Sequence, residues 1–369
     1  MKTKITFLSI LILSIFIFSS CESKRKAKGQ EDEIIVIADS AEFVNLESTL
    51  KSVFGKVIYT PQPEQLFRLN RRDISFLSKL KRAKNIIILA PLNSDSKVSK
   101  YINSSLDENV KDLVLTDSVF VINKYDLWST GQLTMFLTAK DLDMLNLKLL
   151  ENKDDLLYYF KDISNKRLAK GLYNARFEQK NIEANLLTDH GWMIYVQADY
   201  KLAMNKPEDN FVWLRRGVNT NMERWIFVHW IEDATPEFLN KDSIAAKRDE
   251  ITKKFYTTAD DKAYVDHYDD YKMTKEVNFN DKYAIMTQGL WRFNDQSGGG
   301  PFVNYTFYDE DTKRIYMLDA SIFAPKYLKK NLLQQVDVLL HSFKTENEVD
   351  PVRKKEILEE LETEESSKE

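Results

Sequence analysis

The chain has 369 residues, of which 43% are hydrophobic and 12% aromatic, which is enough for a sizeable core and about two domains. Its 53 basic and 57 acidic side chains leave a formal charge of −4, so we expect no nucleic-acid partner. The single cysteine excludes an intrachain disulfide, a zinc site built on cysteines and thiol redox chemistry.

The amino-terminal residues 1–20 form a segment of their own. Lys2 and Lys4 precede an apolar run over residues 5–18, which is shorter than a bilayer-spanning helix and is typical of a signal peptide. Ser19 and Ser20 then stand directly before Cys21, and this order resembles the lipobox of bacterial lipoproteins. We therefore predict cleavage after residue 20 and lipidation of Cys21, which makes the membrane a partner through the lipid. A signal anchor, or an ordinary secretory signal whose cysteine is incidental, is the alternative.

Residues 21–33 are almost entirely polar, which predicts a flexible tether. Its basic cluster (Lys24, Arg25, Lys26 and Lys28) either contacts lipid phosphates or only solvates the tether. The acidic residues 31–33 do not come directly after the cysteine, because the basic cluster lies between them. This order favours a location in the cell envelope that faces the periplasm. The pattern does not distinguish the inner from the outer membrane.

Residues 34–140 alternate between short apolar runs and amphipathic segments, which predicts an α/β subdomain. The run at 34–38 is typical of a buried strand, and Asp39 and Ser40 can cap a helix that ends at Gly55. Further strands are expected at 57–59, 86–90, 118–123 and 132–138, and a further helix at 74–83.

The rest of the chain divides into three parts. Residues 141–190 have helical periodicity and predict a helical connector, whereas residues 191–344 predict an antiparallel sheet with packed helices. Strands are expected at 192–198, 211–216, 223–231, 274–278, 283–292, 302–308 and 314–322, with a last helix after Pro325. Residues 345–369 carry few large apolar groups and predict a charged tail that is disordered or a frayed helix. The fold class is therefore mixed α/β and α+β.

Several stretches of the second half are distinctive as a set. They are FVWLRRG (211–217), ERWIFVHW (223–230), DSIAAKRDEITKKF (242–255), GGPFVNYTFYDE (299–310) and APKYLKKNLLQQVDVLLHSF (324–343). With them the chain resembles a Bacteroidota lipoprotein family, domain of unknown function 4837, over nearly all of residues 34–343. The resemblance implies an envelope lipoprotein and no particular activity. The order of elements also resembles, loosely, the α/β/α sandwich of PsbP and Mog1-like proteins.

Catalytic and metal motifs are weak in this sequence. It contains no G-x-S-x-G elbow, and only four histidines could act as a base. The acidic segment 260–270, with His267, fits no known metal-binding loop. We therefore predict no catalytic residue, no metal site and no cofactor.

Two regions are candidates for contact with a ligand or partner. Gly298, Gly299 and Gly300 mark backbone that has a positive φ or is approached closely, either in a tight loop or at a contact site. Arg215 and Arg216 end a predicted strand and point to opposite sides, so that one of them is free to pair with an acidic group.

Five tryptophans lie between residues 192 and 291, and Trp225 is the candidate among them for contact with a ligand or partner. They either form the core or line an aromatic cleft. The leading hypothesis is a non-enzymatic lipoprotein that binds envelope proteins. The alternative is a solute- or glycan-binding lipoprotein with an aromatic cleft, and the third possibility is a hydrolase whose site is assembled from distant residues.

Overall fold

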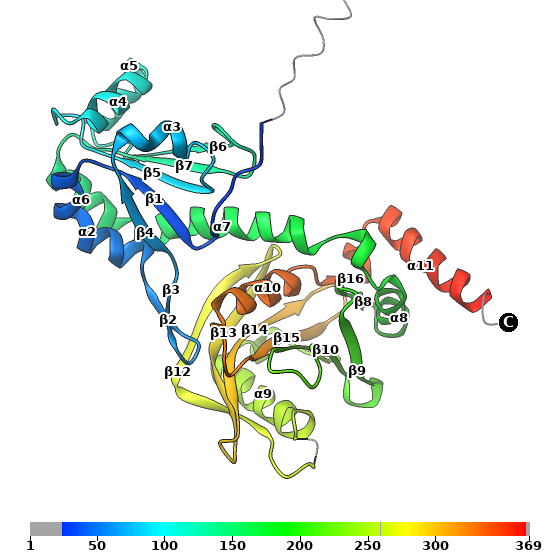
Figure 1. Cartoon of the computed structure of the whole chain (residues 1–369). Coiled ribbons are helices and arrows are strands. Elements are labelled where there is room, and N and C mark those ends of the chain that lie inside the picture. The colour runs from blue at the N-terminus through cyan, green and yellow to red at the C-terminus, as the bar shows by residue number, and fades with distance from the viewer. Residues whose placement is uncertain (1–23, 259, 367–369) are drawn as a thin grey trace, which may run out of the picture. The chain divides into compact units, whose positions relative to one another are not determined.

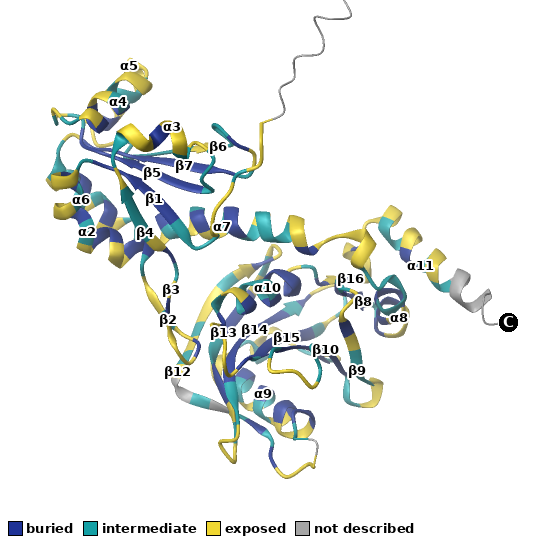
Figure 2. Cartoon of the chain, viewed as in Figure 1, coloured by how far each residue is buried: buried dark blue, intermediate teal, exposed yellow. Residues whose placement is uncertain are grey.

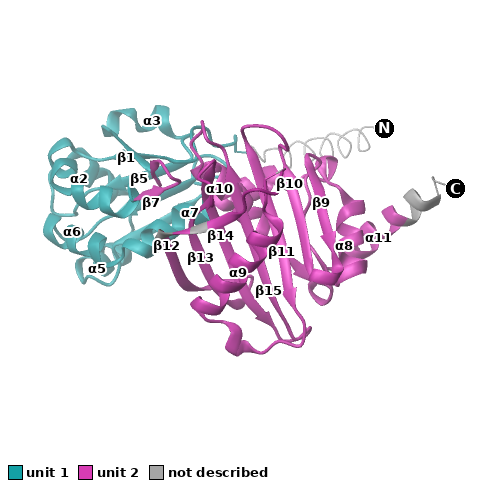
Figure 3. Ribbon diagram, turned by 90° about the horizontal axis from the view of Figure 1, so that it is seen from below, with its two compact units in different colours: residues 1–56, 67–163 teal, residues 57–66, 164–369 magenta. Residues whose placement is uncertain are grey.

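The computed structural model describes residues 24–258 and 260–366, which form two compact units (Figure 3). Unit 1 contains the chain up to Lys56 together with Phe67–Ile163, and unit 2 contains Val57–Leu66 and the chain from Ser164 onward. Cys21, the predicted lipidation site, lies outside the described residues.

Unit 1 is built on a five-stranded, mostly parallel sheet. Its strands are β1 (Glu33–Ile37), β4 (Arg68–Arg72), β5 (Asn85–Leu89), β6 (Val121–Tyr125) and β7 (Leu133–Leu137), in the order β4-β1-β5-β7-β6. Only β6 runs antiparallel to its neighbour. The apolar runs predicted as buried strands form β1 and β5, because a parallel sheet covered on both faces needs apolar side chains on both.

Helices cover both faces of this sheet (Figure 1). They are α2 (Ser40–Phe54), α3 (Leu77–Leu80), α4 (Lys97–Ser105), α5 (Glu108–Leu115), α6 (Leu142–Glu151) and the first part of α7 (Lys153–Leu172). Asp39 caps α2 by accepting from the N–H of Ala41, and the N–H of Gly55 closes its last turn on Lys51. Both ends of this helix are thus where the sequence predicts them.

The prediction of a flexible tether is wrong for the described residues 24–33. The N–H of Ala27 donates to the carbonyl of Thr130 at 2.9 Å, and the N–H of Thr130 donates to the carbonyl of Arg25 at 3.0 Å. Lys28 forms a bridge with Ala83. These residues are held through backbone hydrogen bonds, which the polar character of their side chains does not reveal in the sequence.

Unit 2 is built on a seven-stranded antiparallel sheet. Its strands are β9 (Tyr200–Lys206), β10 (Phe211–Arg216), β11 (Glu223–Ile231), β12 (Val265–Phe279), β13 (Lys282–Phe293), β14 (Gly299–Asp309) and β15 (Arg314–Phe323), in the order β12-β13-β14-β15-β11-β10-β9. α10 (Lys330–Leu340) packs on one face and α9 (Lys241–Phe255) on the other. The hairpin of β2 (Val57–Tyr59) and β3 (Pro63–Gln65) belongs to this unit by its contacts. The mixed fold class is confirmed.

A buried ion pair lies between α9 and the sheet of unit 2. Arg248 donates through Nε to Asp319 at 2.7 Å and through Nη2 at 3.3 Å, and the two side chains are 3% and 0% exposed. Ser321 and Asn304 donate to the same carboxylate at 3.1 and 3.3 Å. The guanidinium also lies 3.6 Å from the centre of the Phe302 ring. The carboxylate is therefore stabilised by several donors at once.

Residues 344–366 are folded, which corrects the prediction of a charged tail that is disordered or a frayed helix. β16 (Lys344–Thr345) pairs with β8 (Trp192–Met193), and α11 (Pro351–Ser366) packs on α8 (Lys180–His190). Ile357 of α11 is fully buried among Leu187, Met193 and Val349. A few apolar side chains are enough to pack α11 against α8. They are too few to give the sequence a clear helical periodicity.

Burial follows the two sheets and the inner faces of their helices (Figure 2). The predicted connector 141–190 is divided between the units, because the boundary falls at Ile163 inside α7. Short 3-10 helices occur at Ile74–Phe76, Ala175–Phe177, Pro207–Asp209, Pro236–Phe238 and Glu346–Glu348. None of the helices in the described part of the chain is both long and apolar enough to span a bilayer.

Candidate functional site

The candidate site is a pocket of about 180 Å³ in unit 2, where the chain end meets α8. The residues that line it are Tyr173, Glu178, Glu183, Met193, Tyr195, Ser342, Lys344, Val349, Asp350 and Arg353. They come from two segments that are far apart in the sequence, 173–195 and 342–353. The pocket exists only because β16 and α11 pack against β8 and α8.

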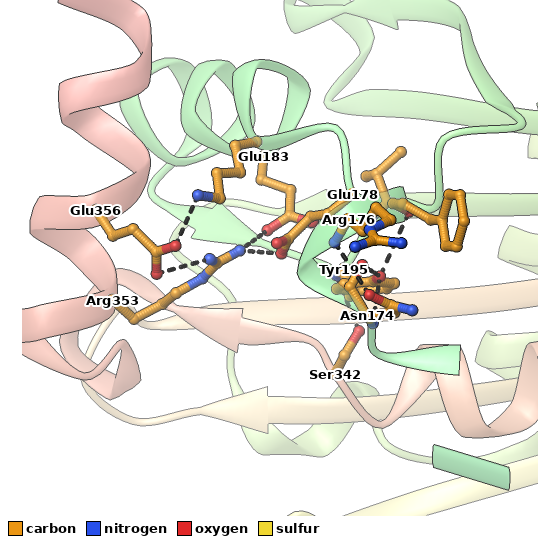
Figure 4. Close-up of polar contacts among 11 residues, drawn as sticks. Asn174, Arg176, Glu178, Glu183, Tyr195, Ser342, Arg353 and Glu356 are labelled. Carbon is orange, nitrogen blue, oxygen red and sulfur yellow. Dashed lines mark hydrogen bonds and ion pairs between the residues drawn. The ribbon is translucent and has the colours of Figure 1, made fainter. Parts of the chain in front are cut away.

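Arg353, in the first turn of α11, organises the charges of this pocket (Figure 4). Its Nη2 lies 2.8 Å from Oε2 of Glu183 and also contacts Glu178, while Nη1 lies 3.0 Å from Glu356. Lys180 holds the other oxygen of Glu356 at 2.7 Å. This ionic cluster fixes the start of α11 to α8.

Glu183 is the most perturbed acid of the cluster. Its side chain is 0% exposed, and its Oε1 accepts the N–H of Val196 at 2.8 Å. Burial raises its pKa to about 8, the nearby charge of Glu178 acts in the same direction, and Val196 and Arg353 oppose the shift. One guanidinium therefore faces the side chains of both Glu178 and Glu183.

Two tyrosines form a rigid wall of the pocket. The hydroxyl of Tyr195 donates to the carbonyl of Asn174 at 3.0 Å and accepts the N–H of the same residue at 2.8 Å. The hydroxyl of Tyr173 donates to the carbonyl of Val338 at 2.6 Å, and the two rings are 5.0 Å apart. Ser342 accepts the N–H of Tyr195 and donates to Leu339, so its hydroxyl is already committed. The wall is preorganised for binding.

The charged side chains at the rim of the pocket are exposed, whereas Glu183 in its interior is buried. Asp350 is exposed and caps α11, accepting the N–H groups of Val352 and Arg353. Lys344 is also exposed, and its ammonium has no ion pair within the part of the chain that the structure describes. The pocket thus presents one available cation above apolar and aromatic walls, which is the composition of a recognition site.

The high pKa of Glu183 predicts how stability depends on pH. Because the folded-state pKa of about 8 is above the model value of 4.5, the folded state binds this proton more tightly than the unfolded state. Its contribution to stability is complete below pH 4.5 and is lost as the pH rises through 8.

Urea unfolding at a series of pH values measures this effect. We expect Glu183→Gln to flatten the decline between pH 5 and 8, whereas Glu360→Gln, which changes an exposed acid on α11, leaves it unchanged. Identical pH profiles for the wild type and Glu183→Gln would contradict the assignment.

Arg215 and Trp225, two residues singled out in the sequence, come together at one end of the unit 2 sheet. They are direct neighbours on β10 and β11, and both donate to Oε2 of Glu223, at 2.6 and 2.8 Å. The guanidinium lies 4.8 Å from the ring of Trp213. Each of the two arginines pairs with an acidic group of this chain, because Arg216 contacts Asp199 at 2.5 Å, so that neither is left free for a group from outside.

The three glycines are explained by packing within the sheet. Gly299 and Gly300 lie inside β14, and none of the three has a positive φ. A Cβ at Gly300 would lie 1.9 Å from the carbonyl oxygen of Ile322 on β15, and one at Gly298 would lie 3.0 Å from the ring of Phe323. Close approach of the backbone is therefore the reason for the run.

The aromatic cleft of the alternative hypothesis is wrong. All five tryptophans of the second half are at most 6% exposed, with their rings in the two cores of unit 2. Trp225 packs against Trp291 with ring centres 5.0 Å apart. The interpretation of β11 as a central strand with bulky side chains on both faces is confirmed.

The described histidines are held by hydrogen bonds. His190 contacts the amide oxygen of Asn205 at 2.8 Å, and His341 contacts the carbonyl of Asp337 at 2.8 Å. His229 contacts the carbonyl of Asn210 at 2.9 Å, and burial lowers its pKa to about 4. His229 is therefore neutral at physiological pH.

The acidic segment 260–270 forms a local turn at its start and then enters β12 at Val265. Asp260 and Asp261 accept the hydroxyls of Thr258 and Thr257, both at 2.7 Å. Among the residues that the structure describes, no group of three or more potential metal ligands faces a common point. The side chain of His267 lies outside the described part.

The pocket residues were missed by sequence reasoning, because nothing in either segment has a recognisable motif. The one available signal was Arg353 with Glu356, an i, i+3 pair within the charged end of the chain. It indicates a helix, but not the partner on which that helix packs.

Comparisons with known proteins find similarity to domains of unknown function and to no protein of known activity over the whole chain. No curated protein matches the chain. A crystal structure from Bacteroides thetaiotaomicron has a TM-score of 0.26 at 4% identity and covers 42% of this chain, which spans 46% of that one. The Saccharomyces cerevisiae Ran-binding protein Mog1p has a TM-score of 0.28 at 11% identity, covering 42% of this chain and 90% of its own.

The family models match a first and a second part of the chain, and their boundary lies near residue 173, whereas the two structural units divide at Ile163. Residues 27–173 match a domain of unknown function (DUF8532), so the resemblance expected over residues 34–343 is confirmed only for the second half. Residues 179–342 match the domain of unknown function (DUF4837). The chain is therefore similar to two domains of unknown function, and the second is the one that its strands and final helix resemble.

Proposed function

We propose that this chain is a lipid-anchored protein of the bacterial cell envelope that acts without catalysis, by binding a partner protein through the pocket of unit 2. The lipid anchor rests on the order of Lys2, Lys4, the apolar run 5–18 and Cys21. The periplasm-facing location rests on the basic residues that follow the cysteine. The partner is a protein of the same envelope.

The observation that carries the binding role is the pocket itself. Its walls are fixed by hydrogen bonds of Tyr173 and Tyr195, and its buried acids are paired with Arg353. The exposed ammonium of Lys344 is the group that remains for a partner. An acidic side chain flanked by apolar groups is the complementary surface.

A binding role also agrees with the hydrogen bonding of Ser342 and with the lowered pKa of His229. Ser342, in the pocket, uses its hydroxyl on the carbonyl of Leu339 at 2.6 Å. His229 has a lowered pKa and is buried in the sheet, away from the pocket residues. A general base needs a pKa near the working pH and access to a substrate.

Crosslinking and pull-down of the lipidated protein from its own envelope tests the proposal. We expect a reproducible envelope partner with the wild type that is lost in Cys21→Ala, which lacks the anchor, and reduced in Lys344→Glu, which reverses the charge at the rim. Lys326→Glu is the matched control, because Lys326 is exposed and lies outside the pocket. Equal capture by Lys344→Glu and Lys326→Glu would contradict the role of the pocket.

A further inference from the structure

Arg224, at the start of β11, is a buried arginine without a partner. The residue is 8% exposed, and its guanidinium forms no hydrogen bond or ion pair within the part of the chain that the structure describes. Its Nε is enclosed without an acceptor, whereas Nη1 and Nη2 are not enclosed, so the tip of the guanidinium reaches solvent. Because an arginine stays charged in proteins, this side chain needs a negative group that the described chain does not supply.

The charged groups around Arg224 leave this end of β10 and β11 positive. Arg224 and Arg216 are directly opposite each other on the two strands, and like charges in such positions repel. Burial lowers the pKa of Arg224, and the charge of Arg216 acts in the same direction. Asp199 is bound to Arg216 at 2.5 Å, and Glu223 is bound to Arg215 at 2.6 Å. Each of these two acids is paired with another arginine, so the charge of Arg224 is left over.

A second buried group without a partner lies on the same face of the sheet. Tyr200 on β9 is directly opposite Arg216, so Tyr200, Arg216 and Arg224 form one row across three strands. Tyr200 is 2% exposed, and its hydroxyl has no hydrogen-bond partner among the described residues. Burial raises the pKa of Tyr200, so the hydroxyl keeps its proton and can donate. Among charged groups, Arg224 acts on this hydroxyl most strongly, which places the two unused donors near each other.

We propose that Arg224 binds the carboxylate of a small organic acid at this end of β9, β10 and β11. The carboxylate accepts N–H groups from the tip of the guanidinium, whose planar fork matches it, and its single negative charge balances the charge left over. The hydroxyl of Tyr200 is a further donor beside it. Because so little of Arg224 is exposed, a small acid reaches it more readily than the surface of a folded protein. The site shares no residue with the pocket in unit 2.

Titration of the full chain with acetate and with inorganic phosphate, at constant pH and ionic strength, tests this site through the temperature of thermal unfolding. We expect acetate to raise the unfolding temperature of the wild type until the site is saturated. Arg224→Met keeps an unbranched side chain of similar length without the charge, and it should abolish this rise. Lys201→Gln is the matched control, because Lys201 is an exposed cation on β9 that pairs with the position of Arg215, on the other face of the sheet. It should leave the rise unchanged.

The proteins without ligand provide a second readout. Arg224→Met removes a buried charge that has no partner, so we expect it to unfold at the temperature of the wild type or above it. A much lower temperature would show that Arg224 has its partner within the chain, and would overturn the proposal. Arg224→Lys keeps the charge without the fork, and it should weaken acetate binding at least about tenfold. An equal rise in the wild type and Arg224→Met, no rise at all, or a larger effect of phosphate than of acetate would also overturn the proposal.

Discussion

Replacing Arg248 with alanine is expected to lower the free energy of unfolding by about 3–5 kcal/mol. The substitution leaves the carboxylate of Asp319 at 0% exposure without its bidentate partner, and Ser321 and Asn304 cannot neutralise its charge. It also removes the contact of the guanidinium with Phe302. Urea unfolding at neutral pH measures the change.

The neighbouring residue supplies the control for this prediction. Lys247 pairs with Glu250 at 2.6 Å on the exposed side of α9, and such surface pairs contribute at most about 1 kcal/mol. Lys247→Ala should therefore have a small effect. Equal stability of the two alanine variants would contradict a stabilising role for the buried pair of Arg248 and Asp319.

Gly300→Ala is expected to destabilise the protein strongly. The added Cβ would lie 1.9 Å from the carbonyl oxygen of Ile322, and neither backbone can move without breaking the pairing of β14 with β15. We expect a loss of about 4 kcal/mol or more, which is the range of severe overpacking and strain. Thermal unfolding followed by circular dichroism measures it.

A second glycine provides the opposite result. Gly171 lies in α7, and a Cβ there would meet nothing within 4 Å. Gly171→Ala should raise the stability of the protein, by up to about 1 kcal/mol, because alanine favours the helix. A similar loss for Gly300→Ala and Gly171→Ala would contradict the interpretation of close backbone approach.

The buried strands were predictable because their composition is dictated by burial on both faces. β1 and β5 are nearly continuous apolar runs, and β11 contains the apolar run Trp225–Val228. β4, with the sequence RLNRR, was missed because it is an edge strand with polar, half-exposed side chains. β9 was missed for the same reason, because it is an edge strand of the seven-stranded antiparallel sheet of unit 2.

The candidate pocket could not be predicted, because it depends on long-range packing. Glu183 and Arg353 are 170 residues apart, and both have the appearance of ordinary charged side chains on helices. What distinguishes them is burial, which raises the pKa of Glu183 and pairs it with Arg353. The tryptophans of the second half were predictable as core, whereas Arg215 and Arg216 were not predictable as paired, because Glu223 and Asp199 lie on neighbouring segments.

The central claim is that the pocket between α8 and α11 binds a partner protein. Its most direct test is a photoreactive amino acid placed at position 344 in the lipidated protein, with the same group at the exposed position Tyr283 on β13 as control. We predict one crosslinked envelope protein from position 344, absent from position 283 and lost when Arg353→Ala detaches α11. Identical products from both positions, or none from position 344, would contradict a binding role for this pocket.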